Sequence, residues 1–136
     1  MNIPRVIHQI WWDFDKIPLE NKPQYYDPHC LTKTFCESHM IGHKLWTKEE
    51  CEKLCHIHYK DLWLSFRYDI QRIDFARLVI LHRFGGIYMD MDIHPIGDID
   101  SLFDQPELLV RWKDAKDCYN AVMGSHIGHP IWKECI

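Results

Sequence analysis

Hydrophobic positions along the chain fall into short runs and into longer stretches with helical spacing. The run "RVIHQIWW" at 5–12 is apolar and contains β-branched residues, and it lies between Pro4 and Asp13. This pattern predicts a buried first strand. Residues 13–28 contain three prolines among polar residues, which predicts a loop. A short helix is expected over 29–41, and "HKLW" after it predicts a second strand.

Two further helices are marked by the residues at their ends. Thr47 and Glu50 have the spacing of a capping box, which predicts a helix over 48–57. A stronger amphipathic segment extends over 70–84, and two glycines directly after it predict its end. Alternation of apolar and polar residues resumes at 87–92, so a strand should follow the Gly-Gly turn at once.

The remaining segments continue the alternation of strands and helices. "ELLVRW" and "YNAVMGS" predict two more strands, and Pro130 suits the first turn of a last helix. Such alternation is typical of an α/β layer fold. At 136 residues the chain has the length of one domain, so we expect a single domain over 1–136.

Composition and charge narrow the classes of function. Hydrophobic residues make up 46% of the chain, which fits a globular protein. The formal net charge of −4 argues against a nucleic-acid-binding surface, which needs a basic excess. The sequence has neither an apolar run of about 18 residues nor a signal-peptide pattern, so we expect a soluble protein of cytoplasmic type. An exposed apolar face could still allow copies of the chain to associate.

Six cysteines and ten histidines leave two interpretations open. Reduced, packed thiols and solvated histidines are favoured, because neither group of these residues has a Cys-x-x-Cys knuckle. A zinc site is the alternative. The two groups that lie close together in sequence are Cys30, Cys36, His39 and His43, and Cys51, Cys55, His56 and His58.

Two carboxylates stand at the end of the predicted strand 87–92. Asp90 and Asp92 alternate with apolar Met89 and Met91, so the period of a strand puts both acids on one face. Two like charges this close repel each other unless something positive lies between them. A divalent metal, a basic side chain and water are the three candidates.

A second pair of charges lies one helix upstream. Asp74 and Arg77 share the face of the 70–84 helix that carries its leucines, whereas Arg72 lies on the opposite, solvent-facing side. Burying a charged pair is costly unless the charges are paired or used. A structural ion pair is one interpretation. The other is a site in which this pair meets the two aspartates across the Gly-Gly turn.

The residue types in this group suit one kind of chemistry. Carboxylates are hard ligands that hold Mg²⁺ or Mn²⁺ and leave positions open for phosphate oxygens. Such a metal could neutralise a departing diphosphate. Arg77 could bind the same phosphates, and Asp74 could accept hydrogen bonds from sugar hydroxyls. Trp11 and Trp12, at the end of the first predicted strand, could stack on a nucleobase.

Three segments of the chain carry a resemblance to one family: "IPRVIHQIWW", "QRIDFARLVILHRFGGIYMDMDIHPI" and "NAVMGSHIGHPIW". They resemble the Asp-x-Asp sugar-binding region of family 32 glycosyltransferases, a group that includes fungal α-1,6-mannosyltransferase-like enzymes. The core motif is also similar to that of the large glucosylating bacterial toxins. The resemblance implies a GT-A-type fold, in which a Rossmann-like nucleotide-sugar-binding sheet is flanked by helices. It also implies a metal-dependent retaining hexosyltransferase that uses Mn²⁺ or Mg²⁺ and a UDP-hexose ahead of GDP-mannose.

The same resemblance assigns roles to the four charged residues. Asp92 would be the direct metal ligand. Asp90 would contact the ribose or the donor sugar, and would reach the metal partly through water. Asp74 and Arg77 would hold the hydroxyls of the donor sugar and the phosphate. The leaving diphosphate would help to deprotonate the acceptor, a glycan or another hydroxyl compound, without an enzymic nucleophile.

Three more residues are assigned by position. Ile10 and Trp11 would line the nucleobase pocket, and Asn120 would lie on the donor or acceptor side. His126 or His129 could complete the metal shell, although a histidine in a turn before a helix is usually solvated.

Two rival functions stay open at this point. Family members usually continue beyond the helix that begins at Pro130, so the chain is expected to be either a minimal enzyme or a fragment. A fragment could be a nucleotide-sugar-binding or carbohydrate-binding module without turnover. A Mg²⁺-dependent phosphotransferase of the haloacid-dehalogenase type also uses Asp-x-Asp at a strand end, but it usually carries the motif near its N-terminus.

Overall fold

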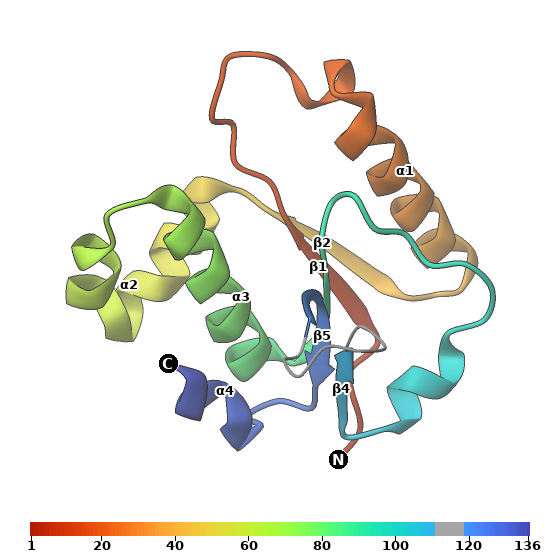
Figure 1. Ribbon diagram of the computed structural model, residues 1–136. Coiled ribbons are helices and arrows are strands. Elements are labelled where there is room, and N and C mark those ends of the chain that lie inside the picture. The colour runs from red at the N-terminus through yellow and green to blue at the C-terminus, as the bar shows by residue number, and fades with distance from the viewer. Residues whose placement is uncertain (111–118) are drawn as a thin grey trace.

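The fold is built on a mixed five-stranded sheet (Figure 1). The computed structural model describes residues 1–110 and 119–136. The strands are β1 (Val6–Ile10), β2 (Gly42–Trp46), β3 (Gly86–Met89), β4 (Glu107–Val110) and β5 (Tyr119–Ser125). Their order in the sheet is β2-β1-β3-β5-β4. β1 is parallel to both β2 and β3, whereas β5 is antiparallel to β3 and to β4.

Helices cover both faces of this sheet. Within the described residues, the α-helices are α1 (Pro23–Ser38), α2 (Lys48–Ser65), α3 (Asp69–Phe84) and α4 (Pro130–Cys135), and the 3-10 helices are η1 (Leu19–Asn21) and η2 (Asp100–Asp104). α1 lies on one side of the sheet, and α2, α3 and α4 lie on the other (Figure 1). The predicted α/β layer fold is therefore confirmed. No helix within the described ranges is long and apolar enough to cross a membrane.

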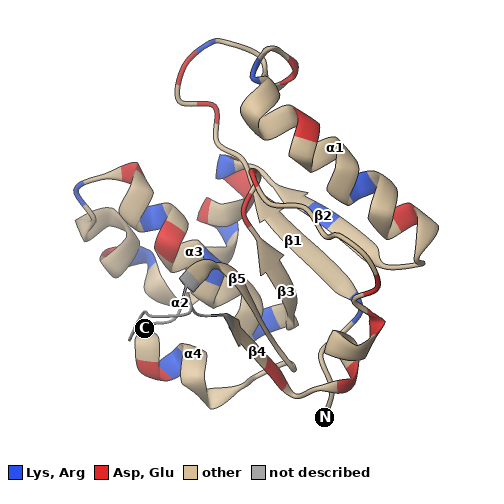
Figure 2. Ribbon diagram, turned by 45° about the vertical axis from the view of Figure 1, so that its right-hand side comes forward, with Lys and Arg blue, Asp and Glu red and all other residues tan. Residues whose placement is uncertain are grey.

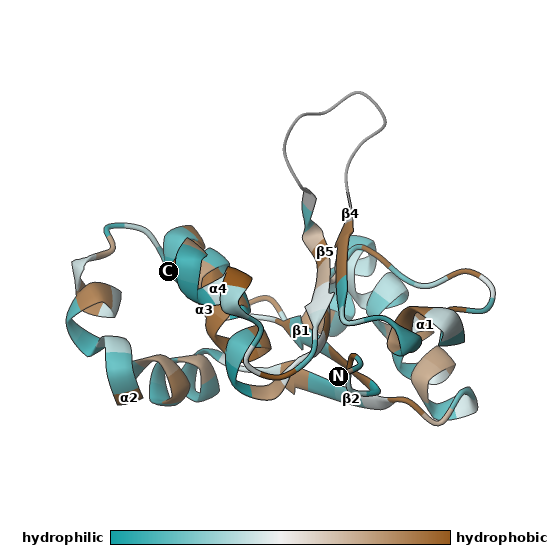
Figure 3. Ribbon diagram, turned by 90° about the horizontal axis from the view of Figure 1, so that it is seen from below, coloured by the Kyte–Doolittle hydropathy of each residue, from teal (hydrophilic) through white to brown (hydrophobic). Residues whose placement is uncertain are grey.

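Each face of the sheet has its own hydrophobic core. The core under α2, α3 and α4 includes Trp63, Ile80 and Trp132. The core on the α1 face includes Ile7 and Ile87 from adjacent parallel strands. Apolar positions follow β4 and β5, and the helices carry both apolar and polar positions (Figure 3). A sheet covered on both faces explains why the first strand reads as a continuous apolar run rather than as an alternation.

The prediction of a loop over 13–28 is wrong in its second half, because α1 begins at Pro23 and includes Pro28. Proline fits the first helical position, where its missing N–H would have no partner in the helix anyway. Pro28 still lies near the N-terminal end of α1, and its carbonyl accepts the Thr32 hydroxyl at 3.1 Å. Pro23 therefore marks the start of a helix rather than a loop, and Pro28 lies inside that helix.

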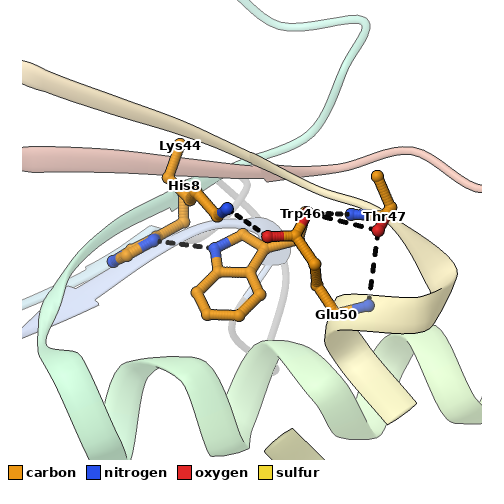
Figure 4. A network of polar contacts seen from close by, with 5 residues as sticks. All are labelled: His8, Lys44, Trp46, Thr47 and Glu50. Atoms are coloured by element: carbon orange, nitrogen blue, oxygen red, sulfur yellow. Dashed lines mark hydrogen bonds and ion pairs between the residues drawn. The ribbon is translucent and has the colours of Figure 1, made fainter. Parts of the chain in front are cut away.

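α2 begins where predicted but extends further. Thr47 Oγ1 accepts the Glu50 N–H at 3.3 Å, and the Thr47 N–H donates to Glu50 Oε1 at 3.2 Å, so the capping box is confirmed (Figure 4). Lys44 on β2 pairs with the same carboxylate. α2 continues to Ser65, but Tyr59 has a non-helical φ of −132° and ψ of 28°. The predicted end near 57 thus lies close to a kink between two helical segments.

The Gly-Gly turn holds the end of α3 tightly against β1. Gly85 and Gly86 have φ values of +65° and +103°, and a Cβ at Gly86 would lie 2.6 Å from Val6 Cγ1. Only glycine fits this approach, so the predicted helix end is confirmed together with its reason. His8 Nε2 donates to the Gly85 carbonyl at 2.8 Å, and its Nδ1 accepts the Trp46 indole N–H at 3.1 Å (Figure 4). Burial lowers the pKa of His8, which suits a neutral ring that donates with one nitrogen and accepts with the other.

Candidate functional site

A cavity of about 340 Å³ opens at the carboxyl ends of β1 and β3. The carboxyl ends of parallel strands are the usual ligand-binding edge of an α/β sheet. The segment after β1, the start of α1, the first half of α3 and the turn after β3 supply its walls. Residues that line it include Ile10, Trp11, Tyr25, Arg77, Asp90 and Asp92. Acidic and basic positions both occur along α3, next to this edge (Figure 2).

The two aspartates do not lie on one strand face, because β3 ends at Met89. Asp90, Met91 and Asp92 instead form a turn, in which the Ile93 N–H donates to the Asp90 carbonyl at 3.1 Å. The side chain of Met91 is buried, whereas Asp92 is exposed. Both carboxylates nevertheless line the cavity, so their convergence arises from the turn and not from strand alternation.

The carboxylate of Asp90 is held through one of its two oxygens. Its Oδ1 lies 3.1 Å from Arg77 Nη2 and accepts the Tyr88 hydroxyl at 2.8 Å. Burial raises the pKa of Asp90, and the Arg77 guanidinium opposes that rise. Burial also raises the pKa of Tyr88 well above its usual value, so Tyr88 stays protonated and donates. No hydrogen bond or ion pair of Asp90 Oδ2 occurs within the described ranges, so both side-chain partners are at Oδ1.

Arg77 is the centre of the charged group. Its side chain is only 9% exposed, and its guanidinium lies 4.7 Å from the centroid of the Tyr88 ring. Nη1 donates to the backbone carbonyl of Asn120 at 3.1 Å, and Nη2 lies 3.6 Å from Asp74 Oδ1 as well as close to Asp90. Arg77 therefore links α3, β5 and the turn after β3. Arg77 thus forms the ion pair of the first interpretation and also lines the cavity with the two aspartates, whereas Asp74 does not line it.

Asp74 and Asn120 lie beside the main cavity rather than in it. They line a neighbouring, mostly apolar cavity of about 330 Å³. The Asp74 side chain is 50% exposed, and Asn120 contacts Arg77 through its backbone carbonyl alone. Five of the seven predicted site residues thus share one cavity, and these two reach it only through Arg77.

Part of the cavity wall is aromatic. The rings of Trp11 and Tyr25 lie 5.1 Å apart, and Lys22 Nζ lies 5.3 Å from the Trp11 ring. Lys22 also donates to Asp15 at 2.8 Å and lowers the pKa of that carboxyl. Trp12 is only 2% exposed and packs against the core, so of the two tryptophans Trp11 is the one available for stacking.

Lys22, Tyr25 and Asp15 were missed by sequence reasoning, because they lie in the segment that the prolines marked as a loop. Only the charge and aromatic character of these residues near Trp11 could have drawn attention to them. Arg72 is likewise not the solvated residue that was expected. It donates to the backbone carbonyls of Trp63 and Phe66 and so fixes the connection between α2 and α3.

The donor set fits a hard divalent cation. The described ranges hold no group of three or more His, Cys, Asp and Glu side chains arranged for a metal, so the protein would contribute few ligands. That suits Mg²⁺ or Mn²⁺, which keep several waters and bind substrate phosphates. Asp92 is exposed, and Asp90 keeps Oδ2 open. These two residues would hold the cation.

The cysteine and histidine groups do not assemble into a zinc site within the described part of the chain. Cys51 and Cys55 are buried on α2, and burial raises the pKa of each thiol to about 12. The other proposed ligands, His126 and His129, follow β5, whose Ser125 pairs with Gly86 at the start of β3. They therefore lie at the opposite end of the strand from Asp90.

The chain matches the family described as "Glycosyltransferase sugar-binding region containing DXD motif" over residues 30–109. It is 32% identical to Inositol phosphoceramide mannosyltransferase 1 of Schizosaccharomyces pombe, over 98% of this chain and 42% of that protein. An uncharacterized glycosyltransferase of Acanthamoeba polyphaga mimivirus is 30% identical over 96% of this chain and 53% of its own length. The chain therefore spans about half or less of each of these relatives.

A solved structure described as "PaToxG Glycosyltransferase" has the same fold. It superposes with a TM-score of 0.62 at 19% identity, over 97% of this chain and 58% of that one. Identity at this level carries the fold and not the substrate. The predicted GT-A-type arrangement of sheet and helices is thereby confirmed.

Proposed function

Because this chain belongs to family 32 of the glycosyltransferases, whose sugar-binding region contains a DXD motif, we propose that it transfers a hexosyl group from a nucleotide-sugar to an acceptor hydroxyl. One observation carries the proposal: a single cavity is lined both by charged Asp90, Asp92 and Arg77 and by aromatic Trp11 and Tyr25. Charged phosphates and a flat nucleobase need these two kinds of surface.

Asp92 and Asp90 are the proposed metal-binding residues. Asp92 is exposed at the cavity and would bind Mn²⁺ or Mg²⁺ directly. Asp90 would use its open Oδ2 toward the ribose or donor sugar, and toward the cation through water, since Arg77 and Tyr88 hold Oδ1. The cation would supply charge neutralisation at the leaving diphosphate.

Arg77 and Asp74 are proposed to act at the sugar and phosphate end. Arg77 is nearly buried and keeps Asp90 oriented, and its positive charge at the cavity would attract the donor phosphates. Asp74 is half exposed beside it and could accept hydrogen bonds from sugar hydroxyls. Asn120 enters this proposal only as the residue whose carbonyl holds Arg77.

The nucleobase would lie against Trp11, with Ile10 below it and Tyr25 beside it. Lys22 and Asp15 offer a donor next to an acceptor in the same wall. Guanine and uracil both present an acceptor oxygen beside an N–H donor on one edge, so this pair suits either base. Similar proteins are named mannosyltransferases, which favours GDP-mannose. We therefore place GDP-mannose ahead of the UDP-hexoses that the sequence favoured.

The acceptor is proposed to be a hydroxyl of a sugar or polyol head group. Two relatives from Schizosaccharomyces pombe are named inositol phosphoceramide mannosyltransferases, so an inositol phospholipid is the first acceptor to test. We propose front-face transfer with retention of configuration. The acceptor oxygen would attack the anomeric carbon from the side of the departing diphosphate, and a phosphate oxygen would take the acceptor proton.

The test is calorimetric titration of GDP-mannose and of UDP-hexoses, with and without Mn²⁺, followed by an assay of nucleoside diphosphate release. We expect Mn²⁺-dependent binding of one donor. Asp92→Asn should weaken it by at least about tenfold, because it replaces the charged carboxylate ligand with a neutral amide. Asp61→Asn, at an exposed position on α2, is the matched control and should bind as wild type.

Three outcomes would count against the proposal. If folded wild-type protein binds none of these donors, the proposed site is wrong. If Asp61→Asn weakens binding as much as Asp92→Asn does, the effect of Asp92 does not come from metal ligation. If a donor binds tightly but no nucleoside diphosphate is released with any acceptor, the rival function, a nucleotide-sugar-binding module, is correct.

A further inference from the structure

The face of α1 that packs on the sheet is unusually polar. Three residues of α1 are buried, and two of them, His29 and Thr32, are polar; the third is Cys36. Burying polar groups costs free energy unless they are hydrogen-bonded, and apolar residues would satisfy packing alone. The partners of His29 and Thr32 therefore need an explanation.

The partner of His29 is Gln9, whose side chain is fully buried on β1. Gln9 Oε1 lies 2.7 Å from His29 Nδ1 and 2.9 Å from Nε2 of His43 on β2. Gln9 Nε2 donates to the backbone carbonyl of Asp90 at 3.3 Å. A chain of hydrogen bonds thus runs from α1 and β2, through one amide, to the turn that carries the two aspartates.

The hydrogen bond between Gln9 and the Asp90 carbonyl fixes the direction of the other two hydrogen bonds of Gln9. The Asp90 carbonyl can only accept, so the amide nitrogen of Gln9 must face it. The amide oxygen then faces both histidines, and each must donate an N–H to it. Burial lowers the pKa of His29, and burial together with the neighbouring His29 lowers the pKa of His43 to about 4. Both rings are therefore neutral near pH 7, with their protons on the nitrogens that face Gln9.

Thr32 reaches the other end of the same turn. Its hydroxyl lies 3.2 Å from the Ile93 carbonyl and 3.1 Å from the carbonyl of Pro28. The turn is closed by the hydrogen bond from the Ile93 N–H to the Asp90 carbonyl, and the Asp90 N–H donates to Ala121 on β5 at 2.8 Å. Polar side chains from the α1 side thus hold both ends of a turn that has Asp92 in its middle.

We propose that Gln9, His29, His43 and Thr32 form a turn clamp that positions Asp90 and Asp92 for metal binding. This inference rests on the proposed function, because it assigns a purpose to the geometry of the metal-binding turn. The clamp residues do not touch the cation or the donor. They act through the backbone carbonyls of Asp90 and Ile93, so they are positioning residues.

The physical reason lies in how few ligands the described residues offer. Of these residues, only Asp90 and Asp92 are proposed to bind the cation, so affinity depends on how often both carboxylates point at the cation together. Asp92 is exposed and has no side-chain partner in the described ranges, so its orientation follows the backbone of the turn. Loss of outer contacts to metal ligands typically weakens metal binding about 10–100-fold.

The first experiment compares Thr32→Val and Thr32→Ser. Valine keeps the volume of threonine but lacks the hydroxyl, whereas serine keeps the hydroxyl. Residue-resolved amide hydrogen exchange in the metal-free protein measures how often the Ile93 N–H leaves the Asp90 carbonyl, and a Mn²⁺ titration measures affinity. We expect Thr32→Val to raise Ile93 exchange and to weaken Mn²⁺ binding about tenfold, and Thr32→Ser to restore both.

The second experiment isolates Gln9 with Gln9→Glu. The two histidine N–H groups favour the ionised carboxylate, which keeps the shape of the side chain and accepts from both rings but cannot donate to the Asp90 carbonyl. We expect faster Ile93 exchange and weaker Mn²⁺ binding. Cys36→Ala is the matched control, because Cys36 lies on the same buried face of α1 but, within the described residues, its side chain makes no hydrogen bond to the turn. It should lower thermal stability and leave Ile93 exchange and Mn²⁺ affinity as in wild type.

The outcomes separate the clamp from the proposed function. Wild-type protein that does not bind Mn²⁺ refutes the proposed function. Wild-type protein that binds Mn²⁺, with equal affinity in Thr32→Val and Gln9→Glu, refutes the clamp and leaves the function standing. Unchanged Ile93 exchange in both variants also refutes the clamp, and so does Cys36→Ala weakening Mn²⁺ binding as strongly as Thr32→Val.

Discussion

Replacing Arg77 with methionine tests the electrostatics of the site most directly. Methionine keeps much of the apolar stem but removes the guanidinium, which lies 3.1 Å from Asp90 and donates to Asn120 at 3.1 Å. The side chain of Asp90 is only 27% exposed, so the variant leaves a largely buried carboxylate without its counter-ion. The carbonyl of Asn120 loses a donor at the same time.

The size of the effect can be worked out from these contacts. At 3.1 Å and an effective dielectric constant of about 20, the pair attracts by about 5 kcal/mol, which the desolvation of Arg77 partly offsets. Breaking a buried pair typically costs about 3–5 kcal/mol. Because Asp90 is partly exposed and Asp74 is half exposed, we take the low end of this range. We expect the free energy of unfolding to fall by about 3 kcal/mol at pH 7.

The loss in free energy of unfolding that Arg77→Met causes should become smaller as the pH falls. Burial already raises the pKa of Asp90 above its unfolded value, and removing Arg77 raises it further. Between the unfolded and the folded pKa, the folded variant binds more protons than the unfolded chain. Its free energy of unfolding therefore rises as pH falls through the folded pKa, and this gain is complete below the unfolded pKa. The gap to wild type should be largest at pH 7 and should narrow toward pH 4.

Urea denaturation of both proteins at several pH values provides the measurement. Arg83→Met is the control, since Arg83 is exposed on the same helix and its loss should stay within about 0.5 kcal/mol. Adding Asp90→Asn to Arg77→Met should recover part of the loss, because asparagine carries no charge. A loss below about 1 kcal/mol at pH 7, or a loss that does not change with pH, would refute the reasoning.

Two further predictions concern the scaffold. Gly86→Ala should destabilise the protein by more than about 4 kcal/mol or prevent folding, because the new Cβ would lie 2.6 Å from Val6 Cγ1 at a φ of +103°. Thermal unfolding followed by circular dichroism measures the effect, and an unchanged melting temperature would contradict the prediction. Thr47→Ala should lower the free energy of unfolding by about 1 kcal/mol through loss of the capping box, whereas Thr47→Ser should lower it little. Equal decreases for the two variants in chemical denaturation would show that the hydroxyl is not the cause.

The helix ends that were predicted correctly are those set by residues close to them in the sequence. The helix that ends at Gly85 is ended by its own glycines, and the helix after Thr47 begins with its own capping box. Both signals act within a few residues, so they can be read without knowledge of the rest of the chain. The start of α1 at Pro23 was missed because the same proline signal fits a loop and a first helical turn equally well.

The site was predicted in its residues and not in its geometry. Asp90 and Asp92 do converge, but through a turn that depends on a hydrogen bond to Ala121 on a strand far along the chain. Arg72 was taken as solvated from its helix face, yet α2 folds back and places two carbonyls within its reach. Periodicity within one helix cannot report which neighbouring element covers its outer face.

The sequence by itself determined the class of the fold, the ends of its main helices and the identity of the charged residues, because spacing and local hydrogen bonding decide these. The tertiary structure alone decided which of them meet. It separated Asp74 and Asn120 from the main cavity, added Lys22 and Tyr25 to it, and placed the Gln9 amide under the turn. Each of these contacts joins residues from different elements, and only the packing of helices against a sheet fixes such distances.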